Sequence, residues 1–168
     1  MLAAIDVQYD EHDCASAGLV LFHDWSDEAP VEIVQHRVPN CEPYEPGNFY
    51  SRELPVILET LESTTHEIDT LIVDCHVDFE LGQPGLGRHL FESLGESVII
   101  IGVAKSRFRD SDFAEELFRG DSRKPLFVTA AGIPNSEAAS RVLSMAGEYR
   151  IPRLLKLADS VARGNHEP

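Results

Sequence analysis

The feature that most constrains the fold is the apolar run Leu71-Ile72-Val73, which ends at Asp74. A strand with apolar residues at successive positions fits a sheet covered on both faces, whereas a half-exposed strand alternates apolar and polar residues. Helical spacing is found both before and after this run. The chain therefore predicts an α/β fold in which helices pack on both faces of a sheet.

The order of the expected elements narrows this further. Three strand patterns open the chain, at 2–9, 17–23 and 31–38, and their short links predict an antiparallel meander. The segments that follow are a helix at 50–62, a strand at 69–74, a glycine-rich loop at 81–87, a helix at 88–94, a strand at 97–103, a helical patch at 113–118, a strand at 125–130, and helices at 135–147 and 153–163. This order, an antiparallel three-strand meander plus parallel strands flanked by helices, predicts a ribonuclease H-like mixed sheet within one domain over residues 1–168.

Composition excludes several classes of protein. The chain has 168 residues, of which 43% are hydrophobic, and no apolar run approaches the roughly 20 residues of a membrane span. Three widely spaced cysteines form no zinc or disulfide pattern. The sequence begins directly in a strand pattern, so we expect a cytoplasmic protein without membrane contact.

The charge is strongly acidic and unevenly distributed. The net charge is −15, and the first 104 residues hold 20 acids but only three arginines. Such a balance argues against non-specific binding to DNA, which favours basic surfaces. It leaves room for metal ions that neutralise an acidic site, and for a local basic rim. Candidates for that rim are Arg107, Arg109, Arg119, Arg123 and Lys124.

Four carboxylates fall where strands end and helices begin. Asp6 lies on the first strand and Asp74 ends the central one, while Glu53 and Glu137 lie on helices. Carboxylates that converge there would bind Mg²⁺ or Mn²⁺, which prefer oxygen ligands. Simpler interpretations remain open: Asp6 pairs with an arginine, Glu53 is solvated, or Glu137 only complements a helix dipole.

The segments around these acids resemble the endonuclease V family. The stretches "AAIDVQY", "PYEPGNFYSRE", "LIVDCH", "IIGVAKSRF" and "PLFVTAAGIPNSEAA" follow one another in the family's order, and the tail "YRIPRLLKLADSVAR" resembles its closing helix. Each motif alone is weak, but five in order are specific. The resemblance implies a metal-dependent endonuclease that cleaves a phosphodiester bond in DNA or RNA near deaminated bases such as inosine.

The resemblance also assigns roles to individual residues. Asp6 and Asp74 would hold the metal, with Glu53 and Glu137 completing the site, and Lys105 would face a phosphate. Substrate contacts fall on a wedge loop and on the residue after Asp74. These are Pro43, Tyr44, Pro46, Gly47, Cys75 and Lys105.

Other residues depart from the family's pattern. Cys75 stands where family members have glycine, and Glu80 stands near the place of an expected histidine. Gly132 stands where family members have a second histidine. The metal acids are thus kept while the residues that read the base are altered. Two further hypotheses remain: a non-catalytic relative that binds nucleic acid or a protein, and another metal-dependent hydrolase on the same scaffold.

Overall fold

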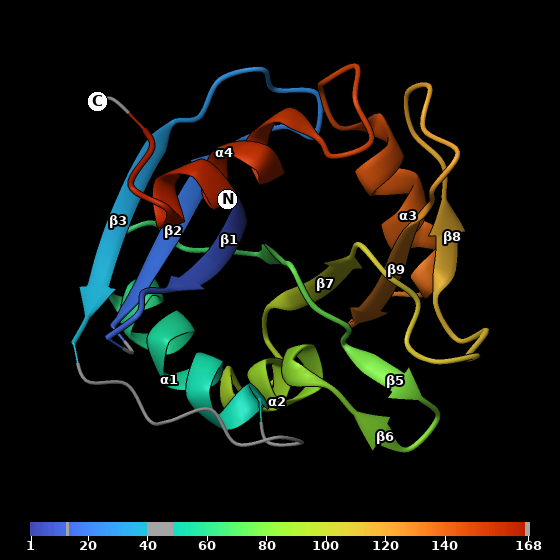
Figure 1. Ribbon diagram of the computed structural model, residues 1–168, viewed down its shortest axis with the longest axis horizontal. Coiled ribbons are helices and arrows are strands. Elements are labelled where there is room, and N and C mark those ends of the chain that lie inside the picture. The colour runs from blue at the N-terminus through green and yellow to red at the C-terminus, as the bar shows by residue number, and fades with distance from the viewer. Residues whose placement is uncertain (13, 40–48, 167–168) are drawn as a thin grey trace.

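A mixed β-sheet forms the centre of the computed structural model, which describes residues 1–12, 14–39 and 49–166 (Figure 1). Within these residues the sheet has seven strands in the order β3-β2-β1-β4-β7-β9-β8. The bounds are β1 Leu2–Tyr9, β2 Ala15–Phe22, β3 Glu32–Val38, β4 Thr70–Val73, β7 Ile99–Ala104, β8 Glu115–Leu117 and β9 Leu126–Ala131. A separate hairpin consists of β5 (Asp78–Glu80) and β6 (Gln83–Pro84).

The sheet combines antiparallel and parallel pairs. β1, β2 and β3 form an antiparallel meander, β4 runs parallel to β1, and β7 runs parallel to β4. β9 is antiparallel to β7, and β8 is antiparallel to β9. The predicted combination of a three-strand meander with parallel strands is confirmed, and the antiparallel pair β8–β9 extends it at one edge.

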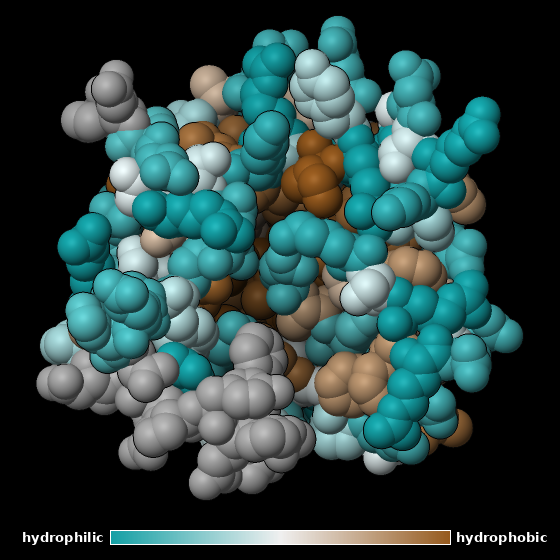
Figure 2. All heavy atoms as spheres, in the orientation of Figure 1, coloured by the Kyte–Doolittle hydropathy of each residue, from teal (hydrophilic) through white to brown (hydrophobic). Residues whose placement is uncertain are grey.

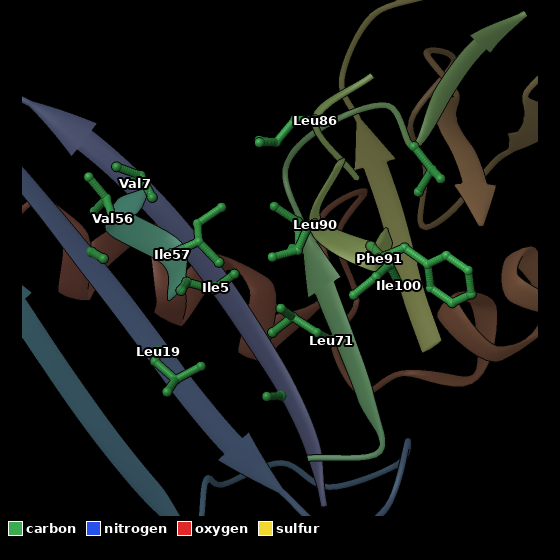
Figure 3. Packing of buried hydrophobic residues seen from close by; sticks show 14 of the residues in the cluster. Ile5, Val7, Leu19, Val56, Ile57, Leu71, Leu86, Leu90, Phe91 and Ile100 are labelled. Atoms are coloured by element: carbon green, nitrogen blue, oxygen red, sulfur yellow. The ribbon is translucent and has the colours of Figure 1, made fainter. Parts of the chain in front are cut away.

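Helices cover both faces of the sheet. α1 (Phe49–Glu62) and α2 (Leu86–Ser93) pack on one face, where Val56, Ile57 and Leu90 meet Ile5 and Leu71 (Figure 3). α3 (Asn135–Ser144) and α4 (Arg153–Ala162) pack on the other. Because side chains alternate along a strand, Ala3 and Ile5 face α1 while Ala4 and Asp6 face α4. The apolar run of β4 is buried on both sides for this reason.

The contact between α4 and β2 is unusually close at Gly18. A Cβ atom added to this glycine would lie 2.3 Å from the Ala158 carbonyl oxygen and 2.6 Å from the Ala162 nitrogen. The helix backbone therefore rests directly on the strand. Since α4 also contacts β1, this close approach sets the distance between α4 and the end of β1.

We expect Gly18→Ala to lower the free energy of unfolding by roughly 1–3 kcal/mol, because the added methyl group must push α4 outward. Urea unfolding measures this change. Gly95→Ala is a control for backbone strain alone, since Gly95 has φ 65° and nothing lies within 4 Å of an added Cβ. A Gly18→Ala protein as stable as the wild type would show that α4 adjusts without cost.

Two sequence expectations are corrected. The expected helical patch at 113–118 is instead strand β8, in which Glu116 pairs with Phe127 and Leu117 pairs with Leu126 of β9. The open edge of β9 offers hydrogen bonds to a segment too short to form a stable helix alone. The expected loop at 81–87 contains β6 and the start of α2.

Among the described residues, none of the helices combines the length and apolar character needed to cross a membrane.

Candidate active site

Asp6 and Asp74 lie side by side because of the parallel register between β1 and β4. Ile5 of β1 pairs with Val73 of β4, and the residue that follows each of them is an aspartate. β4 ends at Val73, and the Cys75 amide donates a hydrogen bond to the Val73 carbonyl oxygen (2.9 Å), which turns the chain away. The carboxyl ends of neighbouring parallel strands thus present two carboxylates at one edge, where open α/β sheets bind ligands.

The Asp6 carboxylate is buried among other acidic groups. The residue is 9% exposed, and the Gln8 side-chain amide donates hydrogen bonds to Asp6 (3.0 Å) and to Asp159 of α4 (3.3 Å). Burial raises the pKa of Asp6 to about 6; the Gln8 hydrogen bond opposes this rise, and the nearby carboxylates of Asp159 and Asp74 add to it. Gln8 therefore bridges two acids from opposite ends of the sequence.

Glu53 approaches the same acids from α1. The residue is 7% exposed, and within the described part of the chain its carboxylate accepts no hydrogen bond. Burial raises the pKa of Glu53 to about 8, with further increases from the charges of Asp6 and Asp74 and a small decrease from Arg52. A buried acid that accepts no hydrogen bond and lies beside two other acids is costly, which is the arrangement expected of a site that binds a cation.

Lys105 follows strand β7 and forms an ion pair with Asp74. Partial burial lowers the pKa of Lys105, but the hydrogen bond to Asp74 and the charges of Asp74, Asp6 and Asp159 raise it overall. The ammonium group is therefore charged. Its backbone is also held, since the Arg150 guanidinium donates hydrogen bonds to the carbonyl oxygens of Lys105 and Pro125, both at 2.6 Å.

Asp159 is a site residue that the sequence analysis missed. It lies on α4, next to the buried Ala158, and Arg163 donates a hydrogen bond to its Oδ1 atom (2.9 Å). The only available signal was an acid within the closing-helix segment. Its relevance depends on α4 crossing β1, a contact between distant segments that no local pattern reveals.

Glu137 lies elsewhere. It occupies the first turn of α3, its side chain is 47% exposed, and its carboxylate accepts a hydrogen bond from Arg141 at 2.5 Å. The structure brings Asp6, Glu53, Asp74 and Lys105 together and does not bring Glu137 to them. The further carboxylate that lies beside Asp6 is that of Asp159.

Two cavities open on either side of the Asp74–Lys105 ion pair, and both are lined by these two residues. The α4 cavity, of about 270 Å³, lies against α4; its other lining residues include Asp6, Ile72, Leu155 and Asp159. The hairpin cavity, of about 350 Å³, lies on the α1–α2 side; its other lining residues include Tyr50, Cys75, His76, Phe79 and Leu86. Figure 2 shows a hollow with a hydrophobic floor in the middle of the face below α4.

Cys75 lines the hairpin cavity, where the family resemblance predicts a substrate contact. Burial raises the pKa of its thiol, and the charges of Glu53 and Asp74 raise it further, so the thiol stays protonated.

The imidazole of His76 lies 3.1 Å from the Ser106 carbonyl oxygen. The chain turns after β4, and Asp78 pairs with Arg88 in the hairpin region. Pro43, Tyr44, Pro46 and Gly47 lie outside the described residues.

The expected basic rim is only partly formed. Arg119 is 6% exposed and donates hydrogen bonds to backbone carbonyl oxygens, so it is corrected from a rim residue to a structural one. Arg107 pairs with Asp112 and Glu116. Arg107 is neutralised within the protein because an acid of the same loop and an acid of β8 lie within reach.

Comparison with known protein families assigns this chain to one of them. The family model "Endonuclease V" matches residues 1–129, which include Asp6, Glu53, Asp74 and Lys105. The chain belongs to the endonuclease V family. This confirms the predicted family and places the chain among nucleases, enzymes that hydrolyse phosphodiester bonds.

Other endonuclease V proteins match almost the whole chain. Those from Xanthomonas oryzae pv. oryzae (strain PXO99A) and Nostoc punctiforme are each 26% identical over 96% of this chain, and the matches cover 76% and 81% of those proteins. The crystal structure of endonuclease V from Bacillus subtilis has a TM-score of 0.81 at 22% identity, covering 97% of this chain and 79% of the other. Endonuclease V from Ciona intestinalis, solved with a 24mer DNA containing an inosine followed by a ribo-adenosine, has a TM-score of 0.77 at 20% identity over 97% of this chain and 84% of the other. These neighbours confirm the ribonuclease H-like fold.

Proposed function

We propose that this endonuclease V relative hydrolyses a phosphodiester bond in DNA or RNA near a deaminated base such as inosine, with a divalent metal ion bound by Asp6 and Asp74. The observation that carries the proposal is the pair of neighbouring strand-end aspartates, surrounded by Glu53 and Asp159 and faced by Lys105. The inosine-containing DNA bound by the Ciona intestinalis protein supports the choice of substrate.

The donor set fits Mg²⁺ or Mn²⁺. All the gathered acids offer carboxylate oxygens, which hard cations prefer. Within the described residues no three His, Cys, Asp or Glu side chains are placed to hold one ion together. A pair of aspartates is sufficient for Mg²⁺, which keeps several waters and takes one or two carboxylates plus substrate phosphate oxygens. When bound, such an ion supplies charge neutralisation and an activated water for hydrolysis.

The protein's own groups have separable roles. The Lys105 ammonium lies at the junction of both cavities, where it would contact a phosphate oxygen. Glu53, whose pKa is raised to about 8 in the metal-free protein, would become charged and complete the acidic set when the cation binds. Asp159 and Gln8 fix the orientation of Asp6.

The hairpin cavity is the proposed place for the base. Tyr50 and Phe79 line it with aromatic rings, Leu86 lines it with an aliphatic side chain, and Cys75 lines it beside Asp74. A base removed from its stack is held by such walls and by hydrogen bonds to its edge. The wedge residues Pro43, Tyr44, Pro46 and Gly47 remain a prediction that the described residues do not address.

Cleavage of labelled oligonucleotides tests the proposal. Single-stranded and duplex DNA and RNA, each with and without one inosine, are incubated with the protein in Mg²⁺ or Mn²⁺. We expect strand cleavage that depends on the metal, stops with EDTA, and is faster for at least one inosine-containing substrate. Cleavage that ignores inosine would contradict only the base preference. Tight binding of these substrates without any cleavage would instead support the non-catalytic alternative.

A further inference from the structure

Lys105 lies where two neighbouring strands of the sheet separate. The pairing of β7 with β9 ends at Ala104 and Phe127, and the carbonyl oxygens of Lys105 and Pro125 lie just beyond that pair. Both oxygens accept hydrogen bonds from one atom, Nη2 of Arg150, at 2.6 Å. Hydrogen bonds from a charged donor are stronger than those between neutral groups. The Arg150 side chain therefore joins the two strand ends at the place where the sheet no longer does.

The Arg150 guanidinium is poorly compensated in every other respect. Arg150 is half-buried and lines the α4 cavity together with Asp6, Asp74 and Asp159. It nevertheless forms no ion pair within the described residues, and its buried Nε atom has no hydrogen-bond partner among them. A buried donor without a partner costs stability. Such a group calls for an explanation other than stability, and a role in the adjoining site supplies one.

The segment that carries Arg150 is itself held in place. Arg119 follows β8, is 6% exposed, and donates hydrogen bonds to the carbonyl oxygens of Met145 (2.5 Å), Gly147 (3.3 Å) and Tyr149 (2.9 Å). The backbone from which the Arg150 side chain extends is therefore fixed to the edge of the sheet. Because the starting point of the side chain is fixed, its guanidinium can in turn fix the end of β7.

Lys105 needs such a fixed backbone because its side chain is long and flexible. Its ammonium group pairs with Asp74, but a cation bound to Asp74 would compete with that ion pair. The ion pair alone therefore cannot keep Lys105 in place. The hydrogen bonds from Arg150 reach the backbone of Lys105 and do not involve Asp74. Their loss matters because a displacement of about 1 Å near the reacting atoms can lower a rate on the order of 100-fold.

We propose that Arg150 is a positioning residue for phosphodiester hydrolysis: by holding the carbonyl groups of Lys105 and Pro125, it sets the place from which the Lys105 ammonium reaches the phosphate. This inference rests on the proposed function, because that function gives Lys105 its phosphate. Arg150 acts through Lys105 and needs no contact with the substrate. A direct contact between its guanidinium and the nucleic acid is the alternative that the experiment separates.

A double-mutant cycle tests whether Arg150 acts through Lys105. Cleavage of a labelled inosine-containing oligonucleotide in Mg²⁺ is measured at saturating protein for wild type, Arg150→Met, Lys105→Met and the double variant. We expect Arg150→Met to lower the rate about 10- to 100-fold in the wild-type protein. In the Lys105→Met protein the same substitution should cost no more than about twofold, because the group that it positions is gone. Equal losses in the two proteins, or no loss in the first, would overturn the proposal.

A second measurement needs no cleavage. The chain has three lysines, Lys105, Lys124 and Lys156, so NMR spectra of protein labelled with ¹³C at the lysine Cε atoms contain three signals. The Lys105 signal is assigned by its loss in Lys105→Met. In EDTA at constant pH we expect Arg150→Met to shift this signal, because the ammonium changes its position relative to Asp74. The Lys156 signal should stay in place. An unshifted Lys105 signal would show that Arg150 does not position Lys105.

Arg153→Met is the matched control. Arg153 is an exposed arginine at the start of α4 that pairs with Glu28 and lines neither cavity. Its replacement should change neither the cleavage rate nor the Lys105 signal, and a change in either would mean that loss of any nearby arginine is sufficient. Absence of cleavage by the wild-type protein would count against the proposed function, whereas the NMR spectra decide the role of Arg150 separately.

Discussion

Replacement of Asp74 by asparagine should reduce cleavage by more than about 100-fold, because even residues that only support metal ligands contribute 10- to 100-fold to activity or metal affinity. Asparagine keeps the size of the side chain but removes the charge that faces Lys105 and repels Asp6 and Glu53. The initial rate of strand cleavage at saturating Mg²⁺ measures the loss.

The fold of the Asp74→Asn protein should be intact. Asp74 follows the end of β4 and its side chain is not part of the apolar core, so urea unfolding should show no large loss of stability. Asp121→Asn makes the same chemical change at an exposed turn and should leave cleavage unchanged. An Asp74→Asn protein that cleaves within tenfold of wild type would show that Asp74 is not required.

The metal-free protein should lose stability as the pH rises from about 4.5 to 8, by an amount on the order of 3 kcal/mol from Glu53 alone. Glu53 has a pKa of about 8 in the folded state against 4.5 ordinarily, so over this range the folded state holds a proton that the unfolded state has released. Raising the pH therefore favours unfolding. Asp6, with its pKa raised to about 6, adds to this trend in the lower part of the range.

Urea unfolding at pH 5, 6, 7 and 8 in EDTA measures this dependence, and Glu53→Gln should remove most of it. Glu92→Gln, an exposed acid on α2, is the control and should keep it. Saturating Mg²⁺ should restore the stability lost at pH 8, since a bound cation favours the charged carboxylates. Equal pH slopes for wild type and Glu53→Gln would contradict the assignment of the buried charge.

The arrangement of the sheet and the pair Asp6–Asp74 could be predicted from the sequence because the relevant patterns are local. A continuous apolar run predicts a strand covered on both faces, and a meander followed by alternating helices and strands fixes the neighbours of β1 and β4. The strand β8 was wrongly predicted as helix because three residues carry too little periodicity to separate the two structures.

Asp159 could not be predicted, for a different physical reason. Its place beside Asp6 depends on how closely α4 approaches the sheet, and Gly18 of β2 sets that distance. A glycine in a strand and an acid in a helix are both common, and only the folded structure joins them. In Glu137 the sequence offered an acid with equally good local signals, which the fold pairs with Arg141 instead.

The span between Gln8 and Asp159, 151 positions in the sequence, has a consequence for biosynthesis. Chains fold progressively as they leave the ribosome. Asp6 is translated long before the helix that brings Asp159 to it, and among the described elements that helix is the last that packs on the sheet's second face. In a nascent chain, the face of β1 and β2 that α4 covers therefore stays exposed until that helix is made. The acidic cluster is completed only when translation of that helix is finished.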